Sequence, residues 1–373
     1  MKKTISLALA LMLLMSILAV PAMAEEGKTR KIGELSMLNI DEAKMKNIMT
    51  ARRLASHIGG EPKDSERPAP PEGEPRDEKG APAEDNFEVV YYDSLDAMLM
   101  ALNAGEIHQM EIYNTTARYL IANNDTLDGV GVTKPDPSAG ETGNTEDVRT
   151  KIDNVMFNDF AFMMTEGREA LRDEFNTAIA AIKEDGTMEK LTAEYIEGVI
   201  DGKEIAPIEL AKIDGAETIK VAITGCLPPM DYIAADGTPA GFNTALLAEI
   251  SKRIGKNIKL VQVDSMGRAP ALASGTVDAV FWTRVNETAA RISSLSEAER
   301  MERKEKNEAE LTESEREFVN KIFELIMPED YSKADLPGGT IVTDSYFSDG
   351  LVMVMLKSEA EAMRPPEPAE AQK

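Results

Sequence analysis

Two Thr-x-x-Arg motifs, at 115–118 and 288–291, have the residue types and spacing that best fit anion binding in this sequence. A guanidinium presents a planar fork of N–H donors that matches a carboxylate. Each motif follows an expected strand and opens a polar helix, where free backbone amides add donors. We therefore expect Arg291, with Thr288, to bind a solute anion. Arg118 and Thr115 form a possible second site, and a purely structural role is the alternative for both motifs.

Four further side chains complete the candidate binding site. The hydroxyl of Thr283 can donate beside the second motif, and the carboxylate of Asp231 can accept from an ammonium group. Tyr232 and Trp282 can supply aromatic walls. The alternative for the two rings is ordinary core packing, and the alternative for Thr283 is strand chemistry.

The chain contains few residues of the types that carry out catalysis or bind a metal. It contains two histidines and one cysteine, Cys226, so a zinc site or a Cys/His nucleophile is not expected. General acid–base chemistry needs a paired acid and base in a cleft, and only Asp231 and Glu287 are candidates. We predict a binding protein rather than an enzyme, with no cofactor and no metal.

Charge and hydropathy limit the partners and the compartment. The formal net charge of −25 disfavours nucleic acid and anionic lipid. Residues 1–24 have the lysines, the apolar run and the Ala-Met-Ala ending of a secretory signal peptide. No later stretch is apolar over the roughly 20 residues that a membrane helix needs. We expect a secreted or periplasmic protein that is not an integral membrane protein.

One ordered pattern occurs twice along the chain. An apolar strand ending in Asp, a helix with Ala-Leu, a glycine, a second strand and Thr-x-x-Arg cover 87–118 and again 258–291. Such a repeat indicates internal duplication, and alternating strands and helices predict α/β units with parallel sheets covered by helices.

The duplication predicts the domain boundaries. The first unit is expected at 25–200, with a proline-rich and charged insertion at 61–86 that is predicted to be disordered. The second unit is expected at 215–358, with a charged helical stretch near 294–326. Residues 359–373 are expected to form a flexible tail.

Several ordered pieces resemble the amino-acid-binding family (family 3) of extracytoplasmic solute-binding proteins, the capture components of ABC importers. Residues 219–264 are similar to the opening of that family, 269–280 to its Leu-x-x-Gly-x-x-Asp segment, and 343–357 to its aromatic crossing strand. Residues 160–196 of the first unit are similar to the closing strand and last helices of the family. The resemblance suggests two tandem, partly degenerate copies.

The resemblance implies two α/β lobes joined by crossing strands, with the ligand enclosed between the lobes. Neither unit has room for a full second lobe, so we expect reduced second lobes, and the units either share one cleft or bind separately. The implied ligand is a small amino-acid-like molecule, and a possible partner is an ABC permease. Leu227, Met230 and Asn243 replace residues that are typical of the family. A scaffold or interaction protein that keeps the fold without a working pocket is therefore the alternative.

Overall fold

The computed structural model describes residues 29–38, 40, 42–56, 87–130, 132, 157–264, 266–285, 316–317, 320–321 and 336–363. Every structural statement below concerns these residues. The predicted signal peptide, the insertion at 61–86 and most of the charged stretch at 294–326 lie outside them.

The first half of the chain builds a parallel three-stranded core. β1 (Arg30–Leu35) lies between β2 (Phe87–Tyr92) and β3 (Gln109–Tyr113) and pairs in parallel with both. A 3₁₀ turn, η2 (Ser36–Leu38), follows β1. The other elements of this half are α2 (Glu42–Ser56), α3 (Leu95–Asn103), α4 (Asn114–Asn123) and β4 (Leu127–Val130). Because Ser94 caps α3 by accepting from the Ala97 amide, the chain turns directly from β2 into the helix.

The second half builds a matching parallel core. β6 (Thr218–Ile223) lies between β10 (Asn257–Gln262) and β11 (Ala279–Val285) and pairs in parallel with both. Its helices are α9 (Phe242–Ile254) and α10 (Arg268–Ala273). A small antiparallel sheet of β7 (Cys226–Leu227), β8 (Asp231–Ile233) and β9 (Pro239–Ala240) separates β6 from α9.

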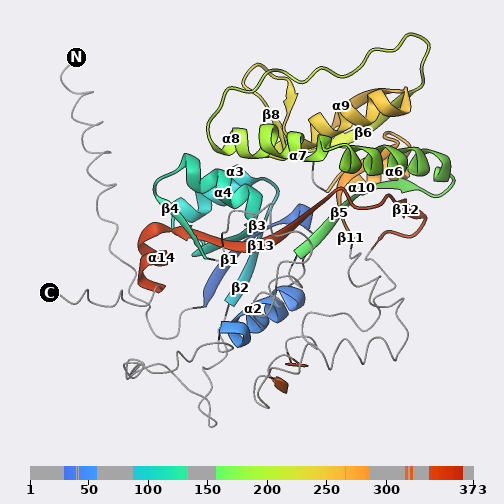
Figure 1. Cartoon of the computed structure of the whole chain (residues 1–373). Helices are drawn as coiled ribbons and strands as arrows, with labels where there is room; N and C mark the ends of the chain where they lie inside the picture. Colours follow the sequence, from blue (N-terminus) through green and yellow to red (C-terminus); the bar gives the residue numbers. More distant parts are fainter. Residues whose placement is uncertain are drawn as a thin grey trace, which may run out of the picture.

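Two long strands join the cores by crossing between them. β5 (Phe157–Thr165) follows the first core in sequence but pairs antiparallel with β11 of the second. β13 (Phe347–Leu356) follows the second core but pairs antiparallel with β3 and β4 of the first. β5 and β13 also pair with each other, and β12 (Thr340–Val342) pairs with β5. The resulting sheet has the order β10-β6-β11-β5-β13-β3-β1-β2, and Figure 1 shows β13 running across from one core to the other.

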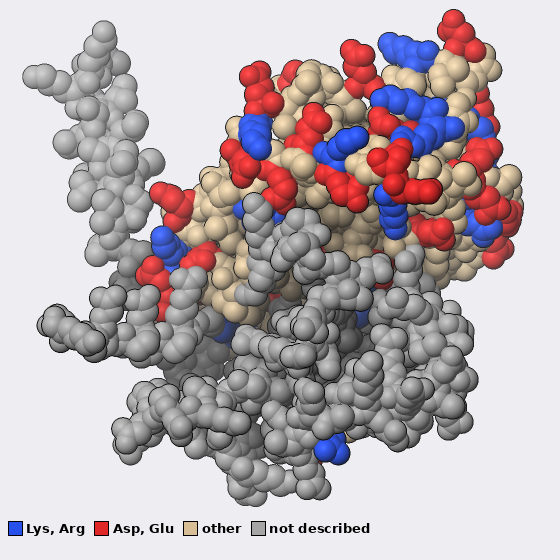
Figure 2. All heavy atoms as spheres, in the orientation of Figure 1, with Lys and Arg blue, Asp and Glu red and all other residues tan. Residues whose placement is uncertain are grey.

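A helical layer follows β5 and covers the second core. It consists of α6 (Glu169–Glu184), α7 (Thr187–Leu191), a π-helical turn, η3 (Thr192–Glu197), and α8 (Gly198–Ile200). Phe175 of α6 packs edge-on against Phe162 of β5, with ring centroids 5.3 Å apart. Acidic and basic side chains alternate over this layer in Figure 2, and Arg253 of α9 pairs with both Asp185 and Glu249 there.

The predicted α/β class is confirmed, and several elements match their expected ranges, including α6 and α9. The sheet is mixed rather than wholly parallel, because the crossing strands and their partners run antiparallel. The sequence reasoning missed β4, β12 and the β7–β9 sheet. A last helix, α14 (Lys357–Met363), continues from β13 and packs on β4, and the flexible tail at 359–373 stays a prediction. The domain boundaries at 200 and 215 stay a prediction.

Candidate functional site

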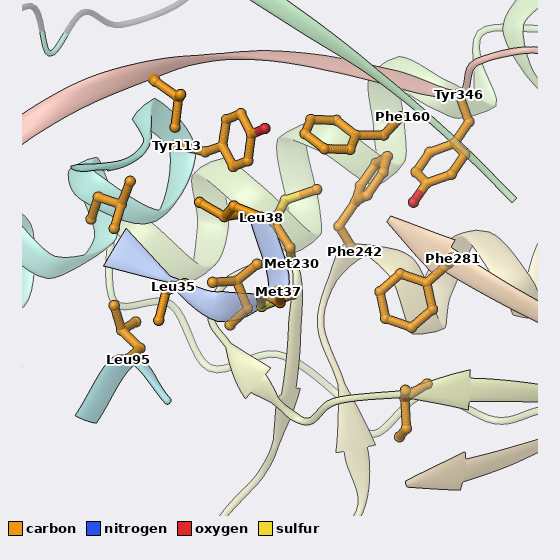
Figure 3. Close-up of a cluster of buried hydrophobic side chains, with 14 of the residues drawn as sticks. Leu35, Met37, Leu38, Leu95, Tyr113, Phe160, Met230, Phe242, Phe281 and Tyr346 are labelled. Carbon is orange, nitrogen blue, oxygen red and sulfur yellow. The ribbon is translucent and has the colours of Figure 1, made fainter. Parts of the chain in front are cut away.

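The carboxyl ends of strands from both halves meet at one buried cluster, which we call the seam. Its labelled side chains in Figure 3 come from β1, η2, α3 and β3 of the first half, from β5, from the residue just before β13, and from the second half. Its members are Leu35, Met37, Leu38, Leu95, Tyr113, Phe160, Met230, Phe242, Phe281 and Tyr346, all buried. The two halves therefore share an apolar contact.

Arg268 links the two halves at the seam. Its Nη1 donates to the carbonyl oxygen of Phe281 at 3.0 Å, and its Nη2 donates to the carbonyl oxygen of Met37 in η2 at 3.1 Å. Burial lowers the pKa of this guanidinium, and the charge of Asp231 and the Tyr346 phenol oppose that shift. One side chain of α10 thus bridges a backbone carbonyl of each half.

Asp231 is fully buried beside the end of β6. Its Oδ2 accepts from the Thr224 amide at 2.7 Å, the Thr224 hydroxyl at 2.6 Å and the Gly225 amide at 2.9 Å. Its Oδ1 is buried and has no hydrogen-bond partner among the described residues. Burial raises the pKa of this carboxyl, while the three donors and Arg268 work in the opposite direction.

The other predicted site residues divide into those that lie in described strands and those that lie outside the described residues. Tyr232 is half-buried in β8, where burial raises its phenol pKa and Tyr119 of the first half adds to the shift. Thr283 is half-buried in β11 and lies opposite Ala161 of β5. Trp282 precedes it in the same strand. Thr288 and Arg291 lie outside the described residues, so their roles stay predictions.

Both residues of the possible second site, Arg118 and Thr115, form hydrogen bonds to other residues of this protein. Arg118 of α4 makes two hydrogen bonds to the carboxylate of Glu197 in η3, at 2.8 and 2.6 Å. The amide of Thr115 donates to Oδ2 of Asp349 at 3.0 Å. Both contacts tie α4 to neighbouring elements, and the role of Arg118 and Thr115 in ligand binding stays a prediction.

Asp349 is a buried carboxylate of β13 at the crossing. Besides Thr115, its Oδ1 accepts from the Gly350 amide at 2.9 Å. Burial raises its pKa from 3.8 to about 6, although these donors and the nearby charge of Arg118 favour the ionised form. A titratable group therefore lies where the crossing strand meets the start of α4.

Sequence reasoning missed Arg268, Asp349 and Glu197. A weak signal existed for Arg268, because it is the one charged residue of an otherwise Ala-, Pro- and Leu-containing helix. No comparable signal marks Asp349 or Glu197, since their partners lie far away in sequence.

Other kinds of site have little support in the part of the chain that is described. It contains no group of three or more His, Cys, Asp or Glu side chains that could hold a metal ion. None of its helices combines the length and the apolar character needed to cross a membrane. A surface groove of about 540 Å³ lies away from the seam, between residues 210–215 and the start of β10.

Comparison with known proteins supports the predicted resemblance. Residues 219–319 match the bacterial extracellular solute-binding proteins, family 3. The match lies within the second half of the chain. The matched range includes Asp231, Arg268 and Thr283 and runs from the second residue of β6 past the end of β11. The tandem arrangement of two family 3 copies stays a prediction.

Solved structures resemble this chain at low identity, and no curated protein matches it. The ligand-binding component of an ABC-type import system from Staphylococcus aureus, with zinc bound, is 12% identical, with a TM-score of 0.35 over 90% of this chain and 68% of that one. The periplasmic aliphatic sulphonate binding protein SsuA from Escherichia coli is 12% identical, with a TM-score of 0.33 over 90% and 67%. The BvgS periplasmic VFT2 domain from Bordetella pertussis is 11% identical, with a TM-score of 0.33 over 90% and 83%.

Proposed function

We propose that this protein captures a small polar, amino-acid-like solute outside the cytoplasm, for ABC-type uptake or for sensing. The match of residues 219–319 to family 3 carries the proposal. The seam adds support, because it lies at strand ends that come from both halves. Ligands of open α/β sheets bind in that position.

The binding residues belong to the same proposal. Arg291 would receive the anionic group of the solute, with Thr288 and Thr283 donating hydroxyls beside it. Asp231 would face the ammonium group, and Tyr232 and Trp282 would form walls. An ABC permease is the proposed partner, and the compartment is secreted or periplasmic.

A thermal-shift panel of amino acids, small peptides and organic acids tests the proposal. A compound present at a hundred times its dissociation constant should stabilise the protein by about 2.7 kcal/mol. Arg291→Ala should remove that stabilisation and leave the melting temperature of the free protein nearly unchanged. A panel in which no compound stabilises the wild-type chain would contradict the proposed function.

A scaffold protein without a working pocket is the second candidate. It is favoured by the buried side chains that fill the seam. A scaffold would show no solute-dependent stabilisation, and its melting temperature would respond instead to a protein partner. The same thermal-shift panel therefore separates the two candidates.

A further inference from the structure

The two halves of the sheet repeat one arrangement of strands. In the first half, β2, β1 and β3 run in parallel, and β13 runs antiparallel beside β3. In the second half, β10, β6 and β11 run in parallel, and β5 runs antiparallel beside β11. A short strand then borders each antiparallel strand, β4 beside β13 and β12 beside β5. The halves therefore have the same topology, and each obtains its antiparallel strand from the sequence of the other.

The helices that follow β5 belong structurally to the second half. α6, α7 and η3 precede β6 in the sequence, and all three pack against α9 of the second core (Figure 1). Arg253 of α9 pairs with Asp185 at the end of α6 at 2.7 Å, and Lys256, just before β10, pairs with Glu174 of α6. The chain thus makes β5 and these helices before it makes the strands that they cover.

The order of the family-like segments in the sequence agrees with this packing. Residues 160–196 resemble the closing strand and last helices of the solute-binding family, and residues 219–264 resemble its opening. The closing segment therefore comes first in this chain, and residues 201–217 connect it to the opening segment. The sequence directly after β1 contains no Pro-Pro pair, whereas the opening segment has Pro228 and Pro229. The opening and closing segments therefore fit one unit rather than two.

The end of β13 and the start of β1 lie at the same edge of the sheet. Val354 of β13 lies opposite Met110 of β3, and Ile32 of β1 lies opposite Gln109 of β3. Because β3 alone separates β13 from β1, these strand ends are about 10 Å apart, or twice the usual spacing between strands. A short connection can span that distance, so the chain could equally run from β13 and α14 into β1.

The connection at residues 201–217 has the features of an added surface segment. It contains no helix or strand, and Lys203 and Pro207 are exposed. Asn257 of β10 holds it, because its side chain accepts from the amide of Ile213 at 2.7 Å and donates to the carbonyl oxygen of Ile213 at 2.9 Å. Circular permutation succeeds at such exposed segments when the original chain ends lie close together.

We propose that the chain is one solute-binding unit in circularly permuted order, with the two halves as its two lobes. In the unpermuted order, β6 to α14 come first, and β1 to α8 follow through a connection from α14. Residues 201–217 join the two ends of that order. The consequence for binding rests on the proposed function and deepens it: one chain binds one solute, and neither half has a site of its own.

A reordered chain tests the permutation. It consists of residues 207–373 followed directly by residues 25–206, and the natural-order chain of residues 25–373 is the matched control with identical composition. We expect a monomer with a single calorimetric transition and a melting temperature within about 4 °C of the control, because the contacts described above are kept. A second version carries ten Gly-Ser residues at the new joint, which span about 17 Å on average.

Isothermal titration of both chain orders counts the sites. The probes are the amino acids, small peptides and organic acids of the thermal-shift panel. A compound that binds should bind one molecule per chain in either order, with affinities that agree within about threefold.

The outcomes separate this inference from the proposed function. Failure of both reordered versions to fold, while the natural-order chain folds, overturns the permutation. Two separate unfolding transitions, or two solute molecules bound per chain, also overturn it, because each result indicates independent units. If both chain orders fold with one transition and neither binds any compound, the proposed function fails and the permutation stands.

Discussion

Asp349 shows how one buried carboxyl makes the joint between the halves sensitive to pH. Its folded pKa of about 6 lies above the ordinary value of 3.8, so the folded chain holds the proton more tightly than the unfolded chain does. The contribution of protonated Asp349 to the free energy of unfolding is complete below about pH 4 and is lost as the pH rises through about 6. This is the opposite of the usual carboxylate in a salt bridge.

Asp349→Asn should remove that pH dependence, because the amide stays neutral and keeps one acceptor for the neighbouring amides. Relative to the variant, the wild-type free energy of unfolding should fall between pH 4 and pH 6 by at most about 3 kcal/mol. Urea denaturation at pH 4, 5, 6 and 7 measures the difference. Asp173→Asn, at an exposed position, is the control, and parallel curves for wild type and Asp349→Asn would refute the assignment.

Residues of the site were predictable only where a local pattern or the family resemblance pointed to them. Asp231 and Tyr232 follow a Pro-Pro turn that the resemblance marks, and both lie beside the seam. Arg268 could not be assigned, because its contact with Met37 joins positions 231 residues apart. The tertiary fold decides which distant residues bury such a charge, and no local sequence pattern predicts that contact.

At the scale of elements, Gly241 fixes the junction between β9 and α9. Its φ is +98°, and an added Cβ would lie 2.7 Å from the carbonyl oxygens of Pro229 and Met230. Those carbonyls accept from the amides of Phe242 and Asn243, the first residues of the helix. The helix start is thus held by backbone acceptors instead of a capping side chain.

Gly241→Ala should destabilise the protein more than Gly237→Ala, which changes another positive-φ glycine with nothing near the added Cβ. Gly241 has a ψ of 173°, which with its positive φ lies in a region essentially confined to glycine, where backbone strain costs on the order of 1–3 kcal/mol, and the close contacts add to that cost only at 241. Chemical denaturation gives both values. Equal losses of stability would show that the junction relaxes freely around the new methyl group.

Elements with a long periodic pattern were predictable, whereas short ones were not. α6 buries Leu171, Phe175, Ala178 and Ile182 at helical spacing, so its extent was clear from sequence. β7 and β9 contain two residues each, too few for a two-residue period to appear. β7 forms because Leu227 pairs with Asp231 of β8, and β9 forms because Ala240 pairs with Tyr232 of β8. These are tertiary contacts, which no sequence period shows.

At the scale of the whole molecule, each half supplies a strand to the other half's sheet. β5 from the first half borders β11, and β13 from the second half borders β3. The repeated sequence pattern predicted two units but did not predict this exchange. Periodicity identifies strands, and it does not determine which strands become neighbours.

A chain divided between Ala206 and Pro207, at an exposed connection, tests the exchange directly. Neither fragment should fold alone, because each leaves a strand edge of its parallel core unpaired. Coexpressed fragments should form a one-to-one complex with a cooperative thermal transition, measured by size-exclusion chromatography and calorimetry. Two fragments that fold separately as monomers would instead support independent tandem units.

The pairing of β13 with β3 also has a consequence for synthesis of the protein. Thr115, just after β3, and its partner Asp349 are 234 residues apart. At usual rates of translation the ribosome needs on the order of 10–50 s to cover that distance. During that interval the nascent chain presents an open strand edge, which other chains can join, so a holding chaperone should improve its yield.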